Sequence, residues 1–313
     1  MKIFLVLSIF LSLLSAKEIE AVYKFKASGF VNDFFISKNK LYIATDAGIL
    51  DIYSLESKKL IDQVVLEPLI SAQGVVIDAH ILSVDMINDK VLFVSTTLSG
   101  YRNVWLYTAH KLRLIVDENR EIAVKEARFI DGEKVMFSTL GAEMILHDIG
   151  ESYSLYTKQI SGSSLGDYQL SKDKKTIALA DESGAVRIMS VAEAKLLAEP
   201  KPQNLDNIFH IAYANGSVLT AGQDRRVGVY PKGISSYYIK TNFLVYCVGL
   251  SPSARIGVYT KGEENVLQLF SPHTKQNLDT LVGHKGIVNQ IKFTSENEFY
   301  SSDRSRYIYF WRF

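Results

Sequence analysis

Few residues of this chain occur in a sequence motif typical of a catalytic or metal-binding site. The segment GSSLG, residues 162–166, matches the G-x-S-x-G pattern that presents a serine nucleophile, here Ser164. That motif works only where a strand turns sharply into a helix. The glycines and serines here instead lie between two strand-like runs, where they are common turn residues. We therefore expect Ser164 to belong to an ordinary connection.

Candidates for metal binding are equally weak. None of the six histidines has a close spacing, such as His-x-His or HExxH, that would place two imidazoles on one ion. The acidic pair Glu263 and Glu264 is expected at a hairpin tip, and the chain contains neither a P-loop nor a GxGxxG motif. The sequence thus predicts no catalytic residue, no bound metal and no cofactor, and hence a protein that is not an enzyme.

Cys247 is the only cysteine, so no internal disulfide can form. It lies in the apolar run FLVYCVGL. This setting favours a buried packing residue over a reactive thiol.

The composition favours strands and gives no sign of a strongly charged partner. Of 313 residues, 47% are hydrophobic and 22% charged, with a net charge of +1. We therefore expect binding neither to nucleic acid nor to an anionic membrane surface. Tyr (17) and Phe (16) are abundant and interleaved with Val and Ile, which favours strands.

A short pattern recurs along the chain as LDIYS, VWLYT, MILHD, VRIMS, VGVYP, LQLFS and IYFWR. The fourth positions are Tyr53, Tyr107, His147, Met189, Tyr230, Phe270 and Trp311. Successive intervals are 54, 40, 42, 41, 40 and 41 residues. Seven such units, each long enough for four short strands, predict a seven-bladed β-propeller with four-stranded antiparallel blades. The predicted single domain spans residues 17–313. Inner strands are clearest in FVNDFFIS and in NIFHIAYANG, which contains His210.

The last unit resembles a WD repeat. It carries a Gly-His pair ending in His284, a Ser-x-Asp formed by Ser301 and Asp303, and Trp311. The resemblance implies that these four side chains hydrogen-bond across the blade. Asp303 lies two residues farther from Trp311 than usual, and Arg312 stands where a second Asp would be. The resemblance covers residues 17–313 and implies a binding platform rather than a catalyst.

The seventh unit supplies three strands and then ends in YIYFWRF, residues 307–313. At the other end, Ile19, Ala21, Tyr23 and Phe25 share one face of a strand-like segment. We expect this segment to supply the missing outer strand by pairing with residues 307–313, which closes the ring and covers an exposed edge.

The first sixteen residues, MKIFLVLSIFLSLLSA, resemble a Sec-type signal peptide cut after Ala16. The apolar run from Ile3 to Leu14 is too short for a stable membrane anchor. The expected location is therefore the periplasm. The alternative is a buried N-terminal strand, since Leu14 is large for position −3.

Two features could carry recognition. The first interval exceeds the others because of an inserted segment, residues 67–79, whose apolar residues are Leu69, Ile70, Val75, Val76 and Ile77. Basic residues are expected in turns on the same face of the ring, at Arg102, Arg225, Arg226, Lys261, Arg304 and Arg306. An apolar loop beside a basic rim predicts a docking face for a protein. The alternative is a decorated loop with solvated charges.

Three functions are compatible with an exported propeller. The stretch KASGFVNDFFISKNKLYIATDAGILDIYSL is similar to the NapL-type proteins of periplasmic nitrate reductase systems. This resemblance implies a non-catalytic scaffold that supports assembly or activity of the reductase, acting as a monomer on a component of that system. The alternatives are an envelope-assembly propeller that docks outer-membrane protein machinery and, less favoured, a propeller hydrolase.

Overall fold

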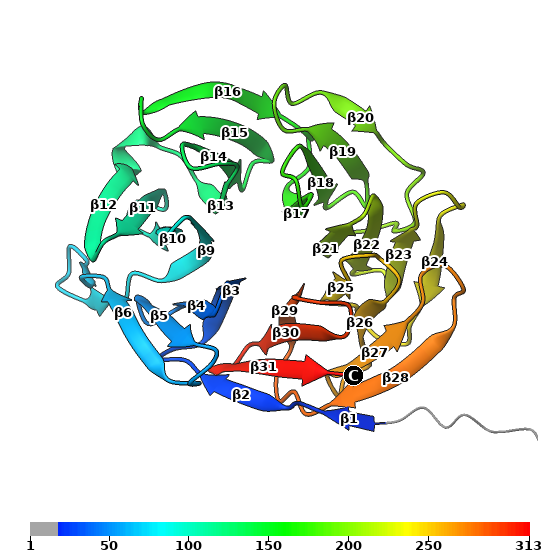
Figure 1. Ribbon diagram of the computed structural model, residues 1–313. Coiled ribbons are helices and arrows are strands. Elements are labelled where there is room, and N and C mark those ends of the chain that lie inside the picture. The colour runs from blue at the N-terminus through cyan, green and yellow to red at the C-terminus, as the bar shows by residue number, and fades with distance from the viewer. Residues whose placement is uncertain (1–17) are drawn as a thin grey trace, which may run out of the picture.

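A computed structural model describes residues 18–313, and these form a ring of seven β-sheets around a central channel (Figure 1). The predicted seven-bladed propeller of four-stranded antiparallel blades is confirmed. The expected signal peptide, residues 1–16, lies outside the described residues. In the first six blades four strands run outward from the channel in chain order, and β3, β9, β13, β17, β21, β25 and β29 surround the axis.

The first four blades follow one another directly along the chain. The first comprises β3 (Val31–Ser37), β4 (Lys40–Thr45), β5 (Ile49–Ser54) and β6 (Leu60–Val65). The second comprises β9 (Ile81–Ile87), β10 (Lys90–Thr96), β11 (Arg102–Thr108) and β12 (Lys111–Val116). The third comprises β13 (Val124–Phe129), β14 (Lys134–Thr139), β15 (Glu143–Asp148) and β16 (Tyr153–Gln159). The fourth comprises β17 (Leu165–Leu170), β18 (Thr176–Asp181), β19 (Val186–Ser190) and β20 (Leu196–Ala198).

The last three blades complete the ring. The fifth comprises β21 (Ile208–Ala214), β22 (Ser217–Gly222), β23 (Arg226–Tyr230) and β24 (Tyr237–Lys240). The sixth comprises β25 (Val248–Leu250), β26 (Gly257–Lys261), β27 (Val266–Phe270) and β28 (Asn277–Val282). The seventh comprises β29 (Val288–Phe293), β30 (Glu298–Asp303), β31 (Tyr307–Arg312) and β2 (Tyr23–Lys26). Outside the blades lie the hairpin of β7 (Leu69–Ile70) and β8 (Val76–Ile77), and one 3-10 turn (Glu118–Arg120).

The core consists of seven apolar clusters, one between each pair of neighbouring blades. Middle strands are buried on both faces, which explains continuous apolar runs such as KVLFVST in β10, where Leu92, Phe93 and Val94 are fully buried. Each blade therefore depends on its two neighbours, and an open ring would expose two blade faces to water.

The N-terminal segment closes the ring as predicted, but it serves two blades rather than one. Residues Tyr23–Lys26 form β2, which pairs antiparallel with β31 and completes the seventh blade. Residues Glu18–Glu20 form β1, which pairs parallel with β28 and adds a fifth strand to the sixth blade (Figure 1). The prediction of one continuous outer strand was therefore incomplete. Ile19 packs into the core between blades six and seven, whereas Phe25 packs between blades seven and one.

Candidate functional site

The inserted segment forms a two-stranded hairpin, β7 and β8, on the connection between blades one and two. Ile70, Val75 and Val76 are 65%, 56% and 65% exposed, and Ile77 is also exposed. Leu69 differs from the prediction, because it is half-buried against the core between these blades. The hairpin therefore presents four apolar side chains to solvent, and the fifth, Leu69, packs against the core.

The predicted basic residues lie in the turns between second and third strands, or at the strand ends beside these turns, and are spread over blades two, five, six and seven. Arg225, Arg304 and Arg306 are exposed, and the Arg306 guanidinium lies 5.8 Å from the centre of the Phe30 ring. Arg226 and Arg102 instead make contacts within the fold. Arg226 is half-buried, stacks on Tyr238 and donates to a backbone carbonyl oxygen.

Arg102 likewise faces inward rather than outward. It is half-buried, lines a cavity at the mouth of the channel and donates to the backbone oxygens of Gly100 and Tyr101. Burial lowers the pKa of Arg102 below its ordinary value. Arg225, Arg304 and Arg306 are thus the predicted arginines exposed on this face, whereas the exposed Lys261 donates from Nζ to Gln268 Oε1 at 3.1 Å.

The four residues of the last blade that resemble a WD repeat do lie together, and all are buried. The Trp311 indole N–H donates to Ser301 Oγ at 2.7 Å, and His284 Nε2 lies 2.8 Å from the same oxygen. His284 Nδ1 lies 3.0 Å from Asp303 Oδ2. Burial lowers the pKa of His284, so the neutral ring donates from Nδ1 and accepts from Ser301 at Nε2. This arrangement ties the loop that carries His284 to strands β30 and β31 of the blade.

The fifth blade builds a similar arrangement from other residue types. Asn204 Nδ2 donates to Asp224 Oδ1 at 2.9 Å, and Thr220 Oγ1 donates to Asn204 Oδ1 at 2.6 Å. Asp224 also accepts from the backbone N–H of Leu205, and Tyr230 takes the place of the tryptophan. Asn204 was not predicted, because an amide does not match the histidine of the motif.

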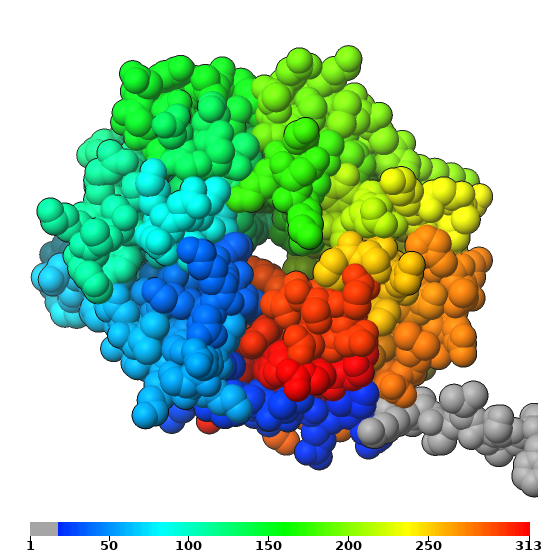
Figure 2. All heavy atoms as spheres, viewed as in Figure 1, coloured from blue at the N-terminus to red at the C-terminus, as the bar shows by residue number. Residues whose placement is uncertain are grey.

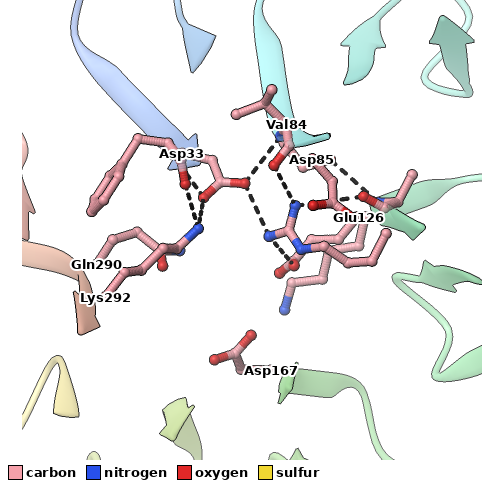
Figure 3. A network of polar contacts seen from close by, with 12 residues as sticks. Asp33, Val84, Asp85, Glu126, Asp167, Gln290 and Lys292 are labelled. Carbon is pink, nitrogen blue, oxygen red and sulfur yellow. Dashed lines mark hydrogen bonds and ion pairs between the residues drawn. The ribbon is translucent and has the colours of Figure 1, made fainter. Parts of the chain in front are cut away.

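The sequence analysis also missed a charged network that crosses the channel (Figure 3). Arg128 Nη2, on blade three, lies 2.9 Å from Asp33 Oδ2 of blade one and 2.9 Å from Glu126 Oε2. Lys292, on blade seven, reaches Asp33 Oδ1 at 2.7 Å. Asp33 also accepts the backbone N–H of Val84, on blade two. One carboxylate therefore links four blades.

Acidic side chains on the inner strands also accept backbone N–H groups of the next blade. Asp85 Oδ2 accepts the N–H of Phe129 at 2.6 Å, and Asp167 Oδ2 accepts the N–H of Ile211 at 2.9 Å. Each bond spans one repeat along the chain. The signal that could have revealed these residues is a charged side chain in an otherwise apolar inner strand. Much of the charge in the channel is therefore structural.

Beside this network lies a cavity of about 240 Å³, lined by residues of every blade except the sixth. It opens toward the centre of the ring, where Figure 2 shows a passage between the blades. Glu126, Asp167, Tyr168 and His210 line the cavity. His210 lies on inner strand β21, as predicted.

Burial raises the pKa of Glu126 to about 7, although the charge of Arg128 opposes the shift. Between pH 4.5 and about pH 7 the Glu126 carboxyl is therefore protonated in the folded protein but ionised in the unfolded chain, where its pKa is 4.5. Stability must therefore fall as the pH rises through this range. We expect a Glu126→Gln variant to lose less stability than the parent between about pH 5 and pH 8, with a difference on the order of 1–3 kcal/mol. Urea unfolding at several pH values measures it, and parallel curves for the two proteins would contradict it.

The other residues considered in the sequence lie in connections between strands or in the core. Ser164 is exposed and is followed by strand β17, so the helix that a nucleophile elbow requires is replaced by a strand. Glu263 and Glu264 lie in the turn between β26 and β27. Cys247 is fully buried, as predicted, and burial raises the pKa of its thiol well above the ordinary value.

Within residues 18–313 there is no group of three or more His, Cys, Asp or Glu side chains placed to hold a metal ion. The same residues include no helix whose length and apolar character would let it cross a membrane. Neither a scan against protein-family models nor a search of curated proteins found a match to this chain.

Proposed function

We propose that this protein is a non-catalytic scaffold that binds a protein partner through the β7–β8 hairpin. The observation that carries the proposal is the exposure of Ile70, Val75, Val76 and Ile77 on an insertion that adds nothing to the blade it follows. Exposed apolar residues gathered on one loop are typical of binding surfaces. Val65, at the end of the adjoining strand β6, is also 64% exposed and extends the apolar surface.

The charges on the same face suggest the chemistry of the partner. Arg225, Arg304 and Arg306 are exposed on turns between second and third strands, which open on the face that carries the hairpin. A partner with an apolar patch flanked by carboxylates would complement this face. The similarity of the first blade to NapL-type proteins supports a component of a periplasmic nitrate reductase system as that partner.

We expect replacement of residues 70–77 by a short Gly-Ser connection to leave stability almost unchanged, because Leu69 and Ala79 retain their core contacts. The same replacement should abolish crosslinking to the reductase component in the native envelope and reduce periplasmic nitrate reduction. A matched control is Leu196→Ser with Leu197→Ser, which removes two exposed leucines from blade four and should change neither.

Normal crosslinks and normal nitrate reduction in the hairpin variant would show that recognition lies elsewhere. Crosslinks to outer-membrane protein machinery would favour the envelope-assembly alternative. Arg225→Glu provides a second readout, since it should weaken capture more at low than at high salt. Arg225 suits this test better than Arg226, whose guanidinium is engaged within the fold.

A further inference from the structure

Most charged groups in the channel cavity already have partners within the fold. Asp85 accepts the backbone N–H groups of Met86 and Phe129, one on each oxygen. Arg128 is bound by Asp33 and Glu126. These contacts give Asp85 and Arg128 a structural role, so neither residue points to a ligand. Polar groups in the cavity that lack such contacts are better candidates for a binding site.

Two buried polar groups in the cavity have no partner within residues 18–313. They are the hydroxyl of Tyr168, a residue only 5% exposed, and Nδ1 of His210, a residue only 8% exposed. Both residues line the cavity. The Tyr168 hydroxyl lies close enough to Glu126 for that charge to raise the tyrosine pKa further above its ordinary value, after burial itself. Buried groups left unsatisfied are costly, so these two point to an occupant that bonds to them.

One end of the cavity is acidic. The contacts of Glu126 to Arg128 and of Asp167 to Ile211 use Oε2 and Oδ2 respectively, which leaves one oxygen of each carboxylate for a ligand. In Figure 3 Asp167 faces the network across an open space and makes none of the drawn contacts. A cationic group placed between the two carboxylates would relieve their mutual repulsion.

The outer end of the cavity is basic. Glu126 and Asp167 lie near the beginnings of their inner strands, whereas the turn after β17 brings Lys172 and Lys174 to the other end of the same cavity. Lys172 is exposed, so the cavity opens to solvent there. Lys174 Nζ donates to the carbonyl oxygen of Phe129 at 2.6 Å and retains two further N–H groups.

We propose that this cavity binds a small flexible zwitterion, with its primary ammonium group between Glu126 and Asp167 and its carboxylate at Lys172 and Lys174. The volume is equivalent to roughly eight waters, which suits a molecule with a similar number of non-hydrogen atoms. Tyr168 and His210 supply hydrogen bonds at the ammonium end. Because Phe129 lies three residues beyond Glu126, the two ends are separated by about 10 Å of strand, which favours an extended ligand.

Calorimetric titration with a series of ω-amino acids, from glycine to 6-aminohexanoate, tests this site in the whole protein. We expect the longer members to bind best and pentylamine and pentanoate to bind at least about 10-fold more weakly, since each lacks one charged contact. Failure of every amino acid to bind at millimolar concentration would overturn the proposal. Equal binding of pentylamine would do so as well, because it would show a site for cations alone.

Variants locate the site. Asp167→Asn keeps an oxygen for the N–H of Ile211 but removes the charge, and we expect about 10- to 100-fold weaker binding. Tyr168→Phe removes a hydroxyl that has no hydrogen-bond partner among residues 18–313, so it should weaken binding without lowering stability. Unchanged affinity in both variants would overturn the proposal. The hairpin replacement is the control and should bind the amino acid like the parent, which separates this test from that of the proposed scaffold function.

Discussion

Deletion of residues 18–26 should leave the ring open and give insoluble protein or protein without a cooperative unfolding transition. The deletion removes β1 from the sixth blade and β2 from the seventh. It also uncovers the edge of β31 and takes Phe25, which is only 3% exposed, out of the core between blades seven and one. An uncovered strand edge with apolar neighbours is prone to aggregation. Solubility and thermal unfolding followed by circular dichroism measure the effect.

Point variants of the same segment separate the contribution of packing from that of strand pairing. Phe25→Ala should cost about 3–5 kcal/mol, as for other buried phenylalanines. Val22→Ala is the matched control, because Val22 is 52% exposed and its substitution should cost little. A deletion variant that melts cooperatively at the parent temperature would show that seven blades close without the N-terminal segment.

Substitution of Arg128 by methionine should cost about 3–5 kcal/mol, because it leaves buried carboxylates without their partner. Burial alone would raise the pKa of Asp33, but the charges of Arg128 and Lys292 lower it below its ordinary value. Without Arg128, Asp33 keeps Lys292 but Glu126 loses the guanidinium 2.9 Å away. Urea unfolding at neutral pH measures the loss.

Arg312→Met provides a matched control for this prediction. Arg312 pairs with Glu298 at 2.7 Å, a distance close to those at Arg128, but its side chain is 62% exposed whereas that of Arg128 is 16% exposed. An exposed pair of this kind contributes less than about 1 kcal/mol. Equal losses for the two variants would contradict the view that burial makes the channel network important.

The expected architecture follows from short-range patterns in the sequence. The recurring bulky residue, from Tyr53 to Trp311, marks the third strand of every blade, and its intervals predict the number of blades. The contacts among His284, Ser301, Asp303 and Trp311 were expected from the resemblance of the last unit to a WD repeat, and they form in the structure.

The sequence predicted the positions of several side chains less accurately than it predicted the fold. The prediction treated Leu69 and Arg226 as parts of an exposed docking face, whereas one packs against the core and the other stacks on Tyr238. Residue type alone does not tell an exposed arginine from one whose guanidinium covers an aromatic ring. The switch of the N-terminal segment between blades was missed for a similar reason, since Ile19 and Phe25 share one alternation but enter different cores.

The sequence by itself determined the strands, their grouping into seven units and the need for an N-terminal strand to close the ring, because alternation and repeat length are local properties of the chain. The tertiary structure alone decided what the channel contains. Asp33 and Lys292 are far apart in sequence, and they meet only because closure brings blade seven beside blade one. Tyr168 and His210 likewise come to line one cavity only when their blades stand around a common axis. Contacts between distant repeats depend on ring geometry, and no spacing along the chain records them.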